Sequence, residues 1–297
     1  MVKSNMKSSI SSKLFDIIII TFVTVFAAAM IYPFLNVIAV SFSSYNAYLN
    51  NPLMIIPSEF NFTAFMYVFA DPSIKSGYIN TGFITIAGTL LGTLLTVSTA
   101  YALSKRGLPG KKFFMVYVIF TSLFSGGIIP GFYLIKNLGL INSLWALILP
   151  SMLTSFNIVL MKNYFEGLPE SLEEAARIDG AGEFYVLFKI IIPISKPIIA
   201  TIALFTAVAY WNSYFTAILY IRDKIKWPLQ LILREIISAA NTQSLQAGGN
   251  LAEIGNMLPT QALQYATLVV VILPILCVYP FLQKYFVQGI TVGAVKG

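Results

Sequence analysis

Long uncharged apolar stretches constrain this chain more than any other feature. They occur six times, at residues 17–58, 76–104, 113–135, 137–161, 197–221 and 254–283. The hydrocarbon core of a bilayer is about 30 Å thick, and a helix of about 20 apolar residues crosses it. Because backbone groups in lipid need internal partners, and because these runs are continuous rather than alternating, the sequence predicts six transmembrane helices.

Composition narrows the class of protein further. The chain has 297 residues, of which 57% are hydrophobic and only 10% charged, so an all-α integral membrane protein is predicted. The net charge is +7. The Lys and Arg residues of the chain flank the apolar windows and form no patch that could follow the phosphate backbone of a nucleic acid. We therefore expect membrane lipid, and no nucleic acid, around this chain.

The residues needed for several kinds of catalysis are absent from the sequence. There is no histidine, which excludes imidazole metal ligands and His-based acid-base chemistry. No segment has the form Gly, four residues, Gly-Lys-Ser/Thr that holds nucleotide phosphates. We predict no enzyme activity, no catalytic residue and no metal site in this polypeptide. The single cysteine, Cys277, lies in the last apolar window and is predicted to be a small buried hydrophobic residue.

The placement of basic residues predicts the orientation. With the N-terminus inside, the inner segments hold thirteen Lys and Arg residues and the outer segments six. Both termini are therefore predicted to be cytoplasmic, and the first window is a retained span rather than a signal peptide. The predicted organisation is a cytoplasmic N-terminus at 1–15, a six-helix transmembrane domain at 16–288 and a cytoplasmic tail at 289–297. The basic turn at 104–112 is explained as a positive-inside anchor.

A polar island at 168–193 interrupts the apolar pattern. Together with Glu166 it holds six of the twelve acidic residues of the chain. Pro169 suits a first helical position and Gly180 a left-handed stop, which predicts a short helix over 168–182. Leu172, Ala175, Ala176 and Asp179 are expected to share one face of it, and the two alanines would leave that face nearly flat. The following segment, 183–196, is predicted to be an interfacial helix.

The spacing of Glu174-Ala175-Ala176, Gly180 and Pro193 resembles the coupling motif, or EAA motif, of ABC importer permeases. The family usually has Leu where Ile192 stands. The resemblance implies that the segment is a coupling helix that contacts a cytoplasmic ATPase. The residues expected to take part are Glu174, Ala175, Ala176, Arg177, Asp179, Gly180 and Pro193. The alternative is an ordinary cytoplasmic loop helix.

The runs 124–130 and 138–150 extend the resemblance to the carbohydrate branch of this family, in particular to its uronide and complex-oligosaccharide group. The resemblance implies a type I importer fold in the bacterial cytoplasmic membrane and half of a translocation pathway. The partners it implies are a second homologous permease in a heterodimer, two ATPase subunits that bind ATP and Mg²⁺, and an extracytoplasmic sugar-binding protein. The glycines in these runs are explained equally well by helix packing or by pathway lining.

The end of the fifth window contains Trp211, Asn212 and Tyr214. Aromatic residues there are typical of interfacial anchors, but aromatic rings with amide and hydroxyl groups also suit a sugar. The family has a Trp-Asn pair at this place, which makes these residues candidates for the substrate pathway. A solvated loop is expected at 222–260. The family resemblance implies that part of this loop can reach into the docked binding protein.

The C-terminal run 286–297 is either a flexible tail or, as the family resemblance implies, a contact with the ATPases. The candidate contact residues are Gln288, Gly289, Gly293 and Lys296. Two alternatives to a sugar permease remain open at this point. One is an ABC importer permease for another small solute, and the other is a membrane scaffold that transports nothing.

Overall fold

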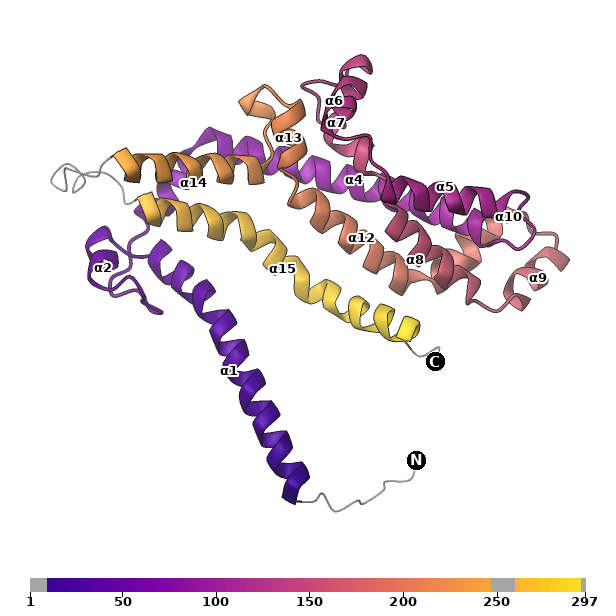
Figure 1. The fold of residues 1–297 in the computed structure, drawn as a ribbon, viewed down its shortest axis with the longest axis horizontal. Coiled ribbons are helices and arrows are strands. Elements are labelled where there is room, and N and C mark those ends of the chain that lie inside the picture. The colour runs from indigo at the N-terminus through magenta and orange to yellow at the C-terminus, as the bar shows by residue number, and fades with distance from the viewer. Residues whose placement is uncertain (1–9, 247–259, 295–297) are drawn as a thin grey trace. The chain divides into compact units, whose positions relative to one another are not determined.

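The computed structural model describes residues 10–246 and 260–294, and within these ranges every regular element is a helix (Figure 1). In chain order the elements are α1 (Ile10–Ser41), α2 (Tyr45–Asn50), α3 (Thr63–Ala70), α4 (Pro72–Ser104), α5 (Lys111–Leu123), α6 (Ile128–Asn137), α7 (Trp145–Ile148), η1 (Leu149–Ser151), α8 (Ser155–Glu166), α9 (Ser171–Ile178), α10 (Glu183–Tyr185), η2 (Val186–Ile191), α11 (Ile192–Ile194), α12 (Lys196–Trp211), α13 (Phe215–Tyr220), η3 (Lys224–Lys226), α14 (Leu229–Gln246) and α15 (Thr260–Ala294). They form two compact units, 1–70 with 237–270 and 71–236 with 271–297.

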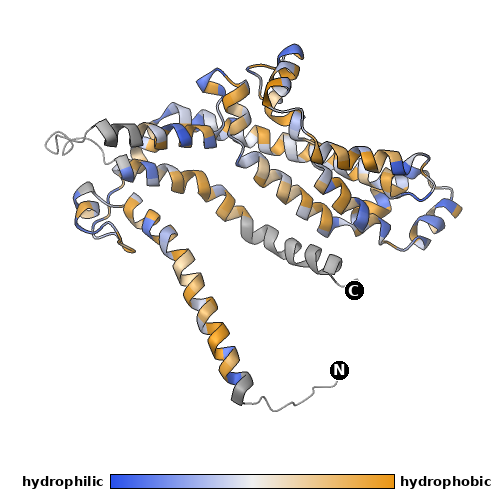
Figure 2. Cartoon of the chain, viewed as in Figure 1, coloured by the Kyte–Doolittle hydropathy of each residue, from blue (hydrophilic) through white to orange (hydrophobic). Residues whose placement is uncertain are grey.

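The first unit contains α1, whose apolar side chains are almost all exposed and appear as a long orange helix in Figure 2. α1 ends at Ser41, so only part of the window 17–58 is a continuous helix. The Asn36 amide donates to the carbonyls of Pro52 and Met54, each at 2.9 Å, and thereby holds the following turns against α1. The apolar window does not continue as one helix because Ser43 and Ser44 lie in a turn after α1, where the Ser44 side chain accepts from the Ala47 amide and caps α2.

In the second unit α4 packs along α8 and α12 (Figure 1). Two glycines allow this close approach. A Cβ atom on Gly88 would lie 2.4 Å from the ring of Tyr210, and one on Gly92 would lie 2.8 Å from the carbonyl oxygen of Met152. The Tyr210 hydroxyl in turn donates to the Ile148 carbonyl at 2.9 Å. These contacts leave no room for adjustment between the helices.

Two of the apolar stretches, 113–135 and 137–161, are broken rather than straight, and a third bend lies just before the stretch 197–221. α5 and α6 meet at 112°, α7–η1 and α8 at 47°, and 183–194 and α12 at 84°. Gly127, with φ +86, lies at the first break, and Pro150 lies in η1 at the second. Within the described ranges three helices could cross a membrane by length and composition, or six if each bent pair is one span. Six straight spans are therefore not observed.

Two predictions about individual regions are wrong. In its described part, the segment 222–260 is mostly the helix α14 rather than a solvated loop, because Leu229, Leu231 and Ile232 are buried on one side of it. The Leu229 amide also donates to the Thr81 hydroxyl at 2.8 Å, which ties α14 to α4. Cys277 is exposed rather than buried, as are its neighbours Leu276 and Val278, because the described helices do not pack around this part of α15.

Candidate functional site

The helix α9 carries the residues of the predicted coupling motif. It begins at Ser171 with Glu170 at the N-cap position, slightly later than Pro169. Glu173 and Glu174 lie in its first turn, where the helix dipole favours negative charge. The local sequence therefore stabilises this short helix at its N-terminus.

The C-terminus of α9 is closed by Gly180. This residue takes φ +80, a left-handed conformation that other residues adopt only at a cost. The Ala181 amide donates to the Ala176 carbonyl at 2.9 Å and the Gly180 amide to the Arg177 carbonyl at 3.0 Å, so the last carbonyls of the helix have partners. The predicted left-handed stop at Gly180 is confirmed.

The two alanines of the motif lie in different surroundings. Ala176 is buried in a core cluster that includes Val186 and Ile191, whereas Ala175 is exposed. Adjacent residues of an α-helix point about 100° apart, because each turn holds 3.6 residues. The flat face expected to hold both alanines is therefore divided, with Ala176 facing this chain and Ala175 facing away.

The outer face of α9 and of the turn after it combines charge with apolar surface. Glu174, Asp179 and Gly180 are exposed. Ile178 and Phe184, on either side of that turn, are 86% and 81% exposed. Large apolar side chains that the chain does not cover, next to exposed carboxylates, are typical of a protein contact surface.

Pro193 lies where the segment after α9 bends toward α12. The π-helix η2 precedes it, and Pro193 occupies α11. Proline has no amide hydrogen, so the regular helical bond is lost there, and π-helical turns often accompany such a break. Val186 and Ile191 of η2 are buried in the same core as Ala176, so α9 is anchored to the helices behind it.

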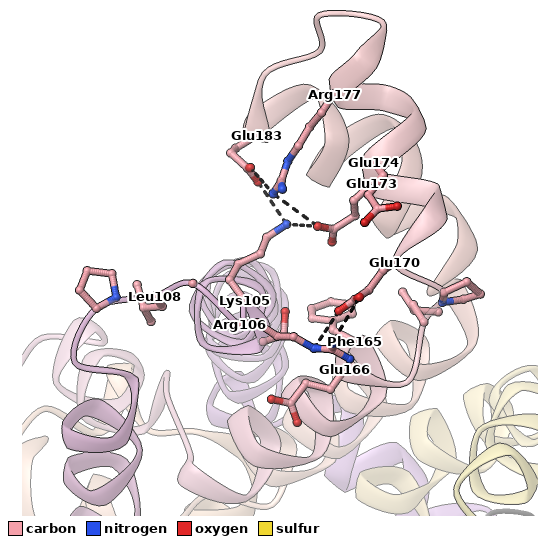
Figure 3. Close-up of a pocket in the computed structure, with 15 residues that line it drawn as sticks. Lys105, Arg106, Leu108, Phe165, Glu166, Glu170, Glu173, Glu174, Arg177 and Glu183 are labelled. Carbon is pink, nitrogen blue, oxygen red and sulfur yellow. Dashed lines mark hydrogen bonds and ion pairs between the residues drawn. The ribbon is translucent and has the colours of Figure 1, made fainter.

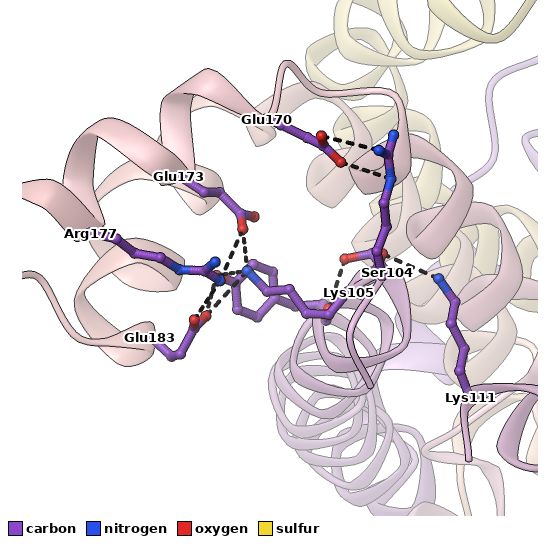
Figure 4. A network of polar contacts seen from close by, with 9 residues as sticks. Ser104, Lys105, Lys111, Glu170, Glu173, Arg177 and Glu183 are labelled. Carbon is purple, nitrogen blue, oxygen red and sulfur yellow. Dashed lines mark hydrogen bonds and ion pairs between the residues drawn. The ribbon is translucent and has the colours of Figure 1, made fainter. Parts of the chain in front are cut away.

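The basic turn after α4 contacts α9 through Lys105. The Lys105 ammonium forms ion pairs with Glu173 and, at 3.2 Å, with Glu183 (Figures 3 and 4). It also donates to the Tyr101 hydroxyl at 2.6 Å, and that hydroxyl donates to Glu183 at 3.0 Å. Arg177 approaches the same two carboxylates, at 3.7 Å from Glu173 and 2.6 Å from Glu183. Three segments of the chain thus share one ionic cluster.

Two further pairs flank this cluster. Arg106 contacts Glu170 at 2.8 Å, with the side chains 82% and 56% exposed. Lys111 and Lys162 both contact Glu166, at 2.8 Å and 2.7 Å. Exposed pairs such as Arg106 with Glu170 typically contribute about 0.2–1 kcal/mol, because water and salt screen them. The Lys105 and Glu173 side chains are only 21% and 23% exposed, so their pair is screened less.

Sequence reasoning missed this network. The turn 104–112 was explained by the positive-inside rule, and the acidic residues 166–183 were considered apart from it. The available signal was that two clusters of opposite charge occur in a chain with few charges. The basic and acidic partners are 55 to 68 residues apart in the sequence, so the sequence does not show which residues pair.

The pKa of Lys105 reports the balance within the cluster. Partial burial of the ammonium lowers its pKa, but hydrogen bonds with Glu173, Tyr101 and Glu183 outweigh this, so the pKa lies above its ordinary value. Lys105 therefore carries a full charge at neutral pH.

An open cavity of about 730 Å³ lies between the basic turn and α9 (Figure 3). Its lining includes Arg106, Pro109, Glu170, Glu174 and Arg177. Glu174 has no side-chain partner within the described part of the chain, unlike Glu170 and Glu173. This carboxylate is therefore available to another molecule.

The predicted pathway residues near 211 contact different neighbours. The Trp211 indole donates to the Val271 carbonyl at 3.3 Å, and Asn212 accepts a hydrogen bond from Gln230 at 3.2 Å. The Tyr214 ring lies 4.7 Å from the Arg234 guanidinium. Trp211 therefore contacts α15, whereas Asn212 and Tyr214 contact α14.

A second cavity, of about 410 Å³, lies where α7–η1 breaks from α8, beside α12. Its lining combines hydroxyl, amide and aromatic side chains, namely Ser151, Thr154, Phe156, Asn157, Phe205, Thr206, Tyr210 and Ser213. Asn157 donates to Thr206 at 3.4 Å across this space. No sequence pattern groups these residues, although Pro150 lies at the break beside the cavity.

The predicted ATPase-contacting residues of the C-terminus fall only partly within the structure. Gln288, Gly289 and Gly293 lie in α15, which continues to Ala294, so much of the predicted tail 289–297 is helical. Lys296 lies outside the described residues.

Residues 88–292 match the family described as binding-protein-dependent transport system inner membrane component. Two proteins of Bacillus subtilis (strain 168) resemble almost the entire chain. The polygalacturonan/rhamnogalacturonan transport system permease protein YtcP is 43% identical over 96% of this chain and 99% of its own length. Protein LplC is 41% identical, with 98% of each chain covered.

The fold is also shared with a solved structure. A chain in the crystal structure of a bacterial ABC transporter involved in the import of the acidic polysaccharide alginate is 35% identical, with a TM-score of 0.86. The match covers 95% of this chain and 100% of that one. The resemblance therefore extends far beyond the motif on α9.

Proposed function

Because this chain belongs to the family of inner membrane components of binding-protein-dependent transport systems, it is a permease subunit of an ABC importer for oligosaccharides, and we propose that its cargo contains acidic sugars. The cargo proposal is supported by similarity over nearly the full chain to two proteins. YtcP is named for polygalacturonan and rhamnogalacturonan, and the alginate importer is described as importing an acidic polysaccharide. The family is that of the permease component and not of a catalytic subunit.

The cargo is tested by competition. Uptake of a labelled galacturonate oligomer by a strain that depends on this chain should be inhibited by unlabelled galacturonate oligomers and not by neutral arabinose oligomers. Equal inhibition by galacturonate and arabinose oligomers would show an oligosaccharide permease that does not prefer acidic sugars. If the strain takes up neither galacturonate nor arabinose oligomers but takes up another solute normally, that solute class would be the cargo instead.

We propose that α9 is the coupling helix that contacts a cytoplasmic ATPase. The exposed carboxylate of Glu174 would meet a polar group on that subunit, while Ile178 and Phe184 would insert into an apolar groove. Arg177 and Ala176 would act from within, by holding the helix in place. Gly180 and Pro193 would shape the two turns that present the helix.

Glu174→Lys tests this assignment. We expect the variant to stay in the membrane and to lose sugar uptake by roughly tenfold or more, because one lost charge contact of 1.4 kcal/mol or greater corresponds to a tenfold change. Ser171→Lys is the matched control, since Ser171 is exposed on the same helix but outside the motif. Normal growth of the Glu174→Lys strain on the sugar would contradict the role of this helix.

The topology follows from the same proposal. We propose six crossings, with each bent pair counted as one span, and both termini in the cytoplasm of a bacterium. In a Cys277→Ser background, a cysteine at Gly107 should react with an impermeant maleimide only in inverted vesicles, and a cysteine at Lys136 only in intact cells. The opposite pattern would invert the topology.

The proposed assembly contains a second homologous permease, two ATPases with ATP and Mg²⁺, and an extracytoplasmic sugar-binding protein. Gln288, Gly289, Gly293 and Lys296 would add a contact with the ATPases. Purification of tagged chain from its native membrane, followed by mass identification, tests this assembly. Recovery of the chain alone, by an extraction that preserves other complexes, would favour a scaffold that transports nothing.

The translocation pathway is proposed to include the 410 Å³ cavity beside α12. Its hydroxyl and amide groups can exchange hydrogen bonds with sugar hydroxyls, and its aromatic rings can stack on a pyranose. Trp211, Asn212 and Tyr214, at the end of α12, would extend the pathway from there.

A further inference from the structure

Lys105 occupies an unusual position between two helices. It is the C-cap residue of α4, and its ammonium reaches carboxylates on α9 and α10 (Figure 4). The chain itself connects α9 to the packed helices at both ends, through residues 167–170 to α8 and through α10, η2 and α11 to α12. The ionic cluster around Lys105 adds a charged, noncovalent contact from α9 directly to the end of α4.

We propose that Lys105 is a positioning residue that joins the coupling helix to α4, so that α4 carries displacements of α9 to the translocation pathway. The proposal rests on the proposed function of α9 as the ATPase contact. It adds a specific ion pair and a specific helix to that function. Without the ion pair, α9 would still be held by its chain connections to α8 and α12 and by the burial of Ala176, but the charged contact at the end of α4 would be lost.

The construction of α4 suits this role. It is one continuous helix of 33 residues, about 50 Å long at 1.5 Å per residue. Its middle packs without spare room against Tyr210 of α12 and the Met152 carbonyl that precedes α8. Tyr210 lines the 410 Å³ cavity. A shift at the Lys105 end of α4 is therefore transmitted to the wall of that cavity.

The surroundings of Lys105 distinguish it from the other basic residues of the turn. The Tyr101 hydroxyl fixes its ammonium, and the Tyr101 ring is buried against Phe165. The neighbouring Arg106 pair is mostly exposed and lacks such support. Interactions of charges in partly buried surroundings are stronger than those in water. Arg106 therefore serves as a control of equal charge on the adjacent position.

Arg177 limits the structural damage that loss of Lys105 causes. Its guanidinium already contacts both Glu173 and Glu183, so neither carboxylate is left without a cation when Lys105 is removed. A Lys105→Gln variant should accordingly fold and assemble, while the connection between α9 and α4 is weakened. This separation between assembly and coupling makes the proposal testable.

The experiment uses the complete transporter, with its ATPases and binding protein, in proteoliposomes. Sugar uptake and ATP hydrolysis are measured in the same preparation. For Lys105→Gln we expect ATP hydrolysis to persist while the amount of sugar taken up per ATP falls. The expected fall is roughly fivefold or more, because fivefold is the lower end of typical coupling between two sites. Lys105→Arg, which keeps the charge, should restore most of the ratio, and Arg106→Gln should retain it.

Unchanged uptake per ATP in Lys105→Gln would overturn the proposal and leave the proposed function intact. Equal losses in Lys105→Gln and Arg106→Gln would also overturn it, because only net charge would matter. If Lys105→Gln does not reach the membrane, Glu173→Gln removes the partner of the same ion pair on α9. Unchanged uptake per ATP in Glu173→Gln, or a loss equal to that of Arg106→Gln, would then overturn the proposal. Failure of the wild-type chain to assemble with any ATPase would instead refute the proposed function itself.

Discussion

Two of the regions where α4 contacts the rest of its unit are held by different interactions. At Lys105, charged groups on flexible side chains meet beside an open cavity of about 730 Å³. At Gly88 and Gly92, backbone and ring atoms of neighbouring helices touch with no space for one more carbon. Ion pairs can be rearranged by a partner, whereas close packing moves as a unit. The comparison suggests that the charged end receives a signal and that the packed middle transmits it.

The packed middle should be the more sensitive of the two regions to a change of one carbon atom. Gly88→Ala places a methyl group against the Tyr210 ring, and we expect a loss of about 1–3 kcal/mol in the free energy of unfolding. Thermal unfolding of the detergent-solubilised protein measures this loss.

Gly82→Ala is the control on the same helix, because nothing lies within 4 Å of its added carbon. Its stability should be unchanged or slightly higher, since alanine favours a helix more than glycine does. Equal stability of the Gly88 and Gly82 variants would show that the α4–α12 contact is not tightly packed.

Within the charged region, the turn after α9 should respond to backbone strain. Gly180→Ala forces alanine into a left-handed conformation at a cost of roughly 1–2 kcal/mol, and Gly182→Ala does not, because Gly182 has φ −75. We expect faster amide hydrogen exchange across α9 in the first variant alone. Identical exchange in both variants would mean that the ion pairs, and not the turn, hold α9.

The smallest expected effect is that of alkaline pH on the Lys105 cluster. The folded pKa of Lys105 lies above its ordinary value of 10.5, so its stabilisation is complete below 10.5 and is lost only as the pH rises through the folded pKa. The ratio of uptake per ATP between wild type and Lys105→Gln should therefore be the same at pH 7 and pH 9. A ratio that approaches one at pH 9 would show that Lys105 loses its charge earlier.

Some features of the site were predictable because they depend on neighbouring residues. The left-handed stop was predicted from the glycine at position 180, and the approximate position of α9 from Pro169 before it and Gly180 after it. The helical class of the described chain follows from continuous apolar runs. The family followed from the motif and is confirmed over residues 88–292.

Other features depend on contacts between distant segments and were missed. The breaks within the apolar windows were not predicted, because hydropathy indicates whether a segment prefers lipid or water and not whether its helix is straight. The helix α14 was mistaken for a loop, since its polar C-terminal half obscured the buried leucines at its start.

By itself the sequence determined that this chain is a helical membrane protein of a permease family, because apolar length and motif spacing are local properties. Only the tertiary structure decided that Ala176 faces inward, that the Glu174 side chain has no partner among the described residues, and that Lys105 joins α4 to α9. The physical reason is that an ion pair needs two groups within about 4 Å in space. Residues 105 and 173 are separated by 68 positions, and only the packing of α4 against α8 brings them together.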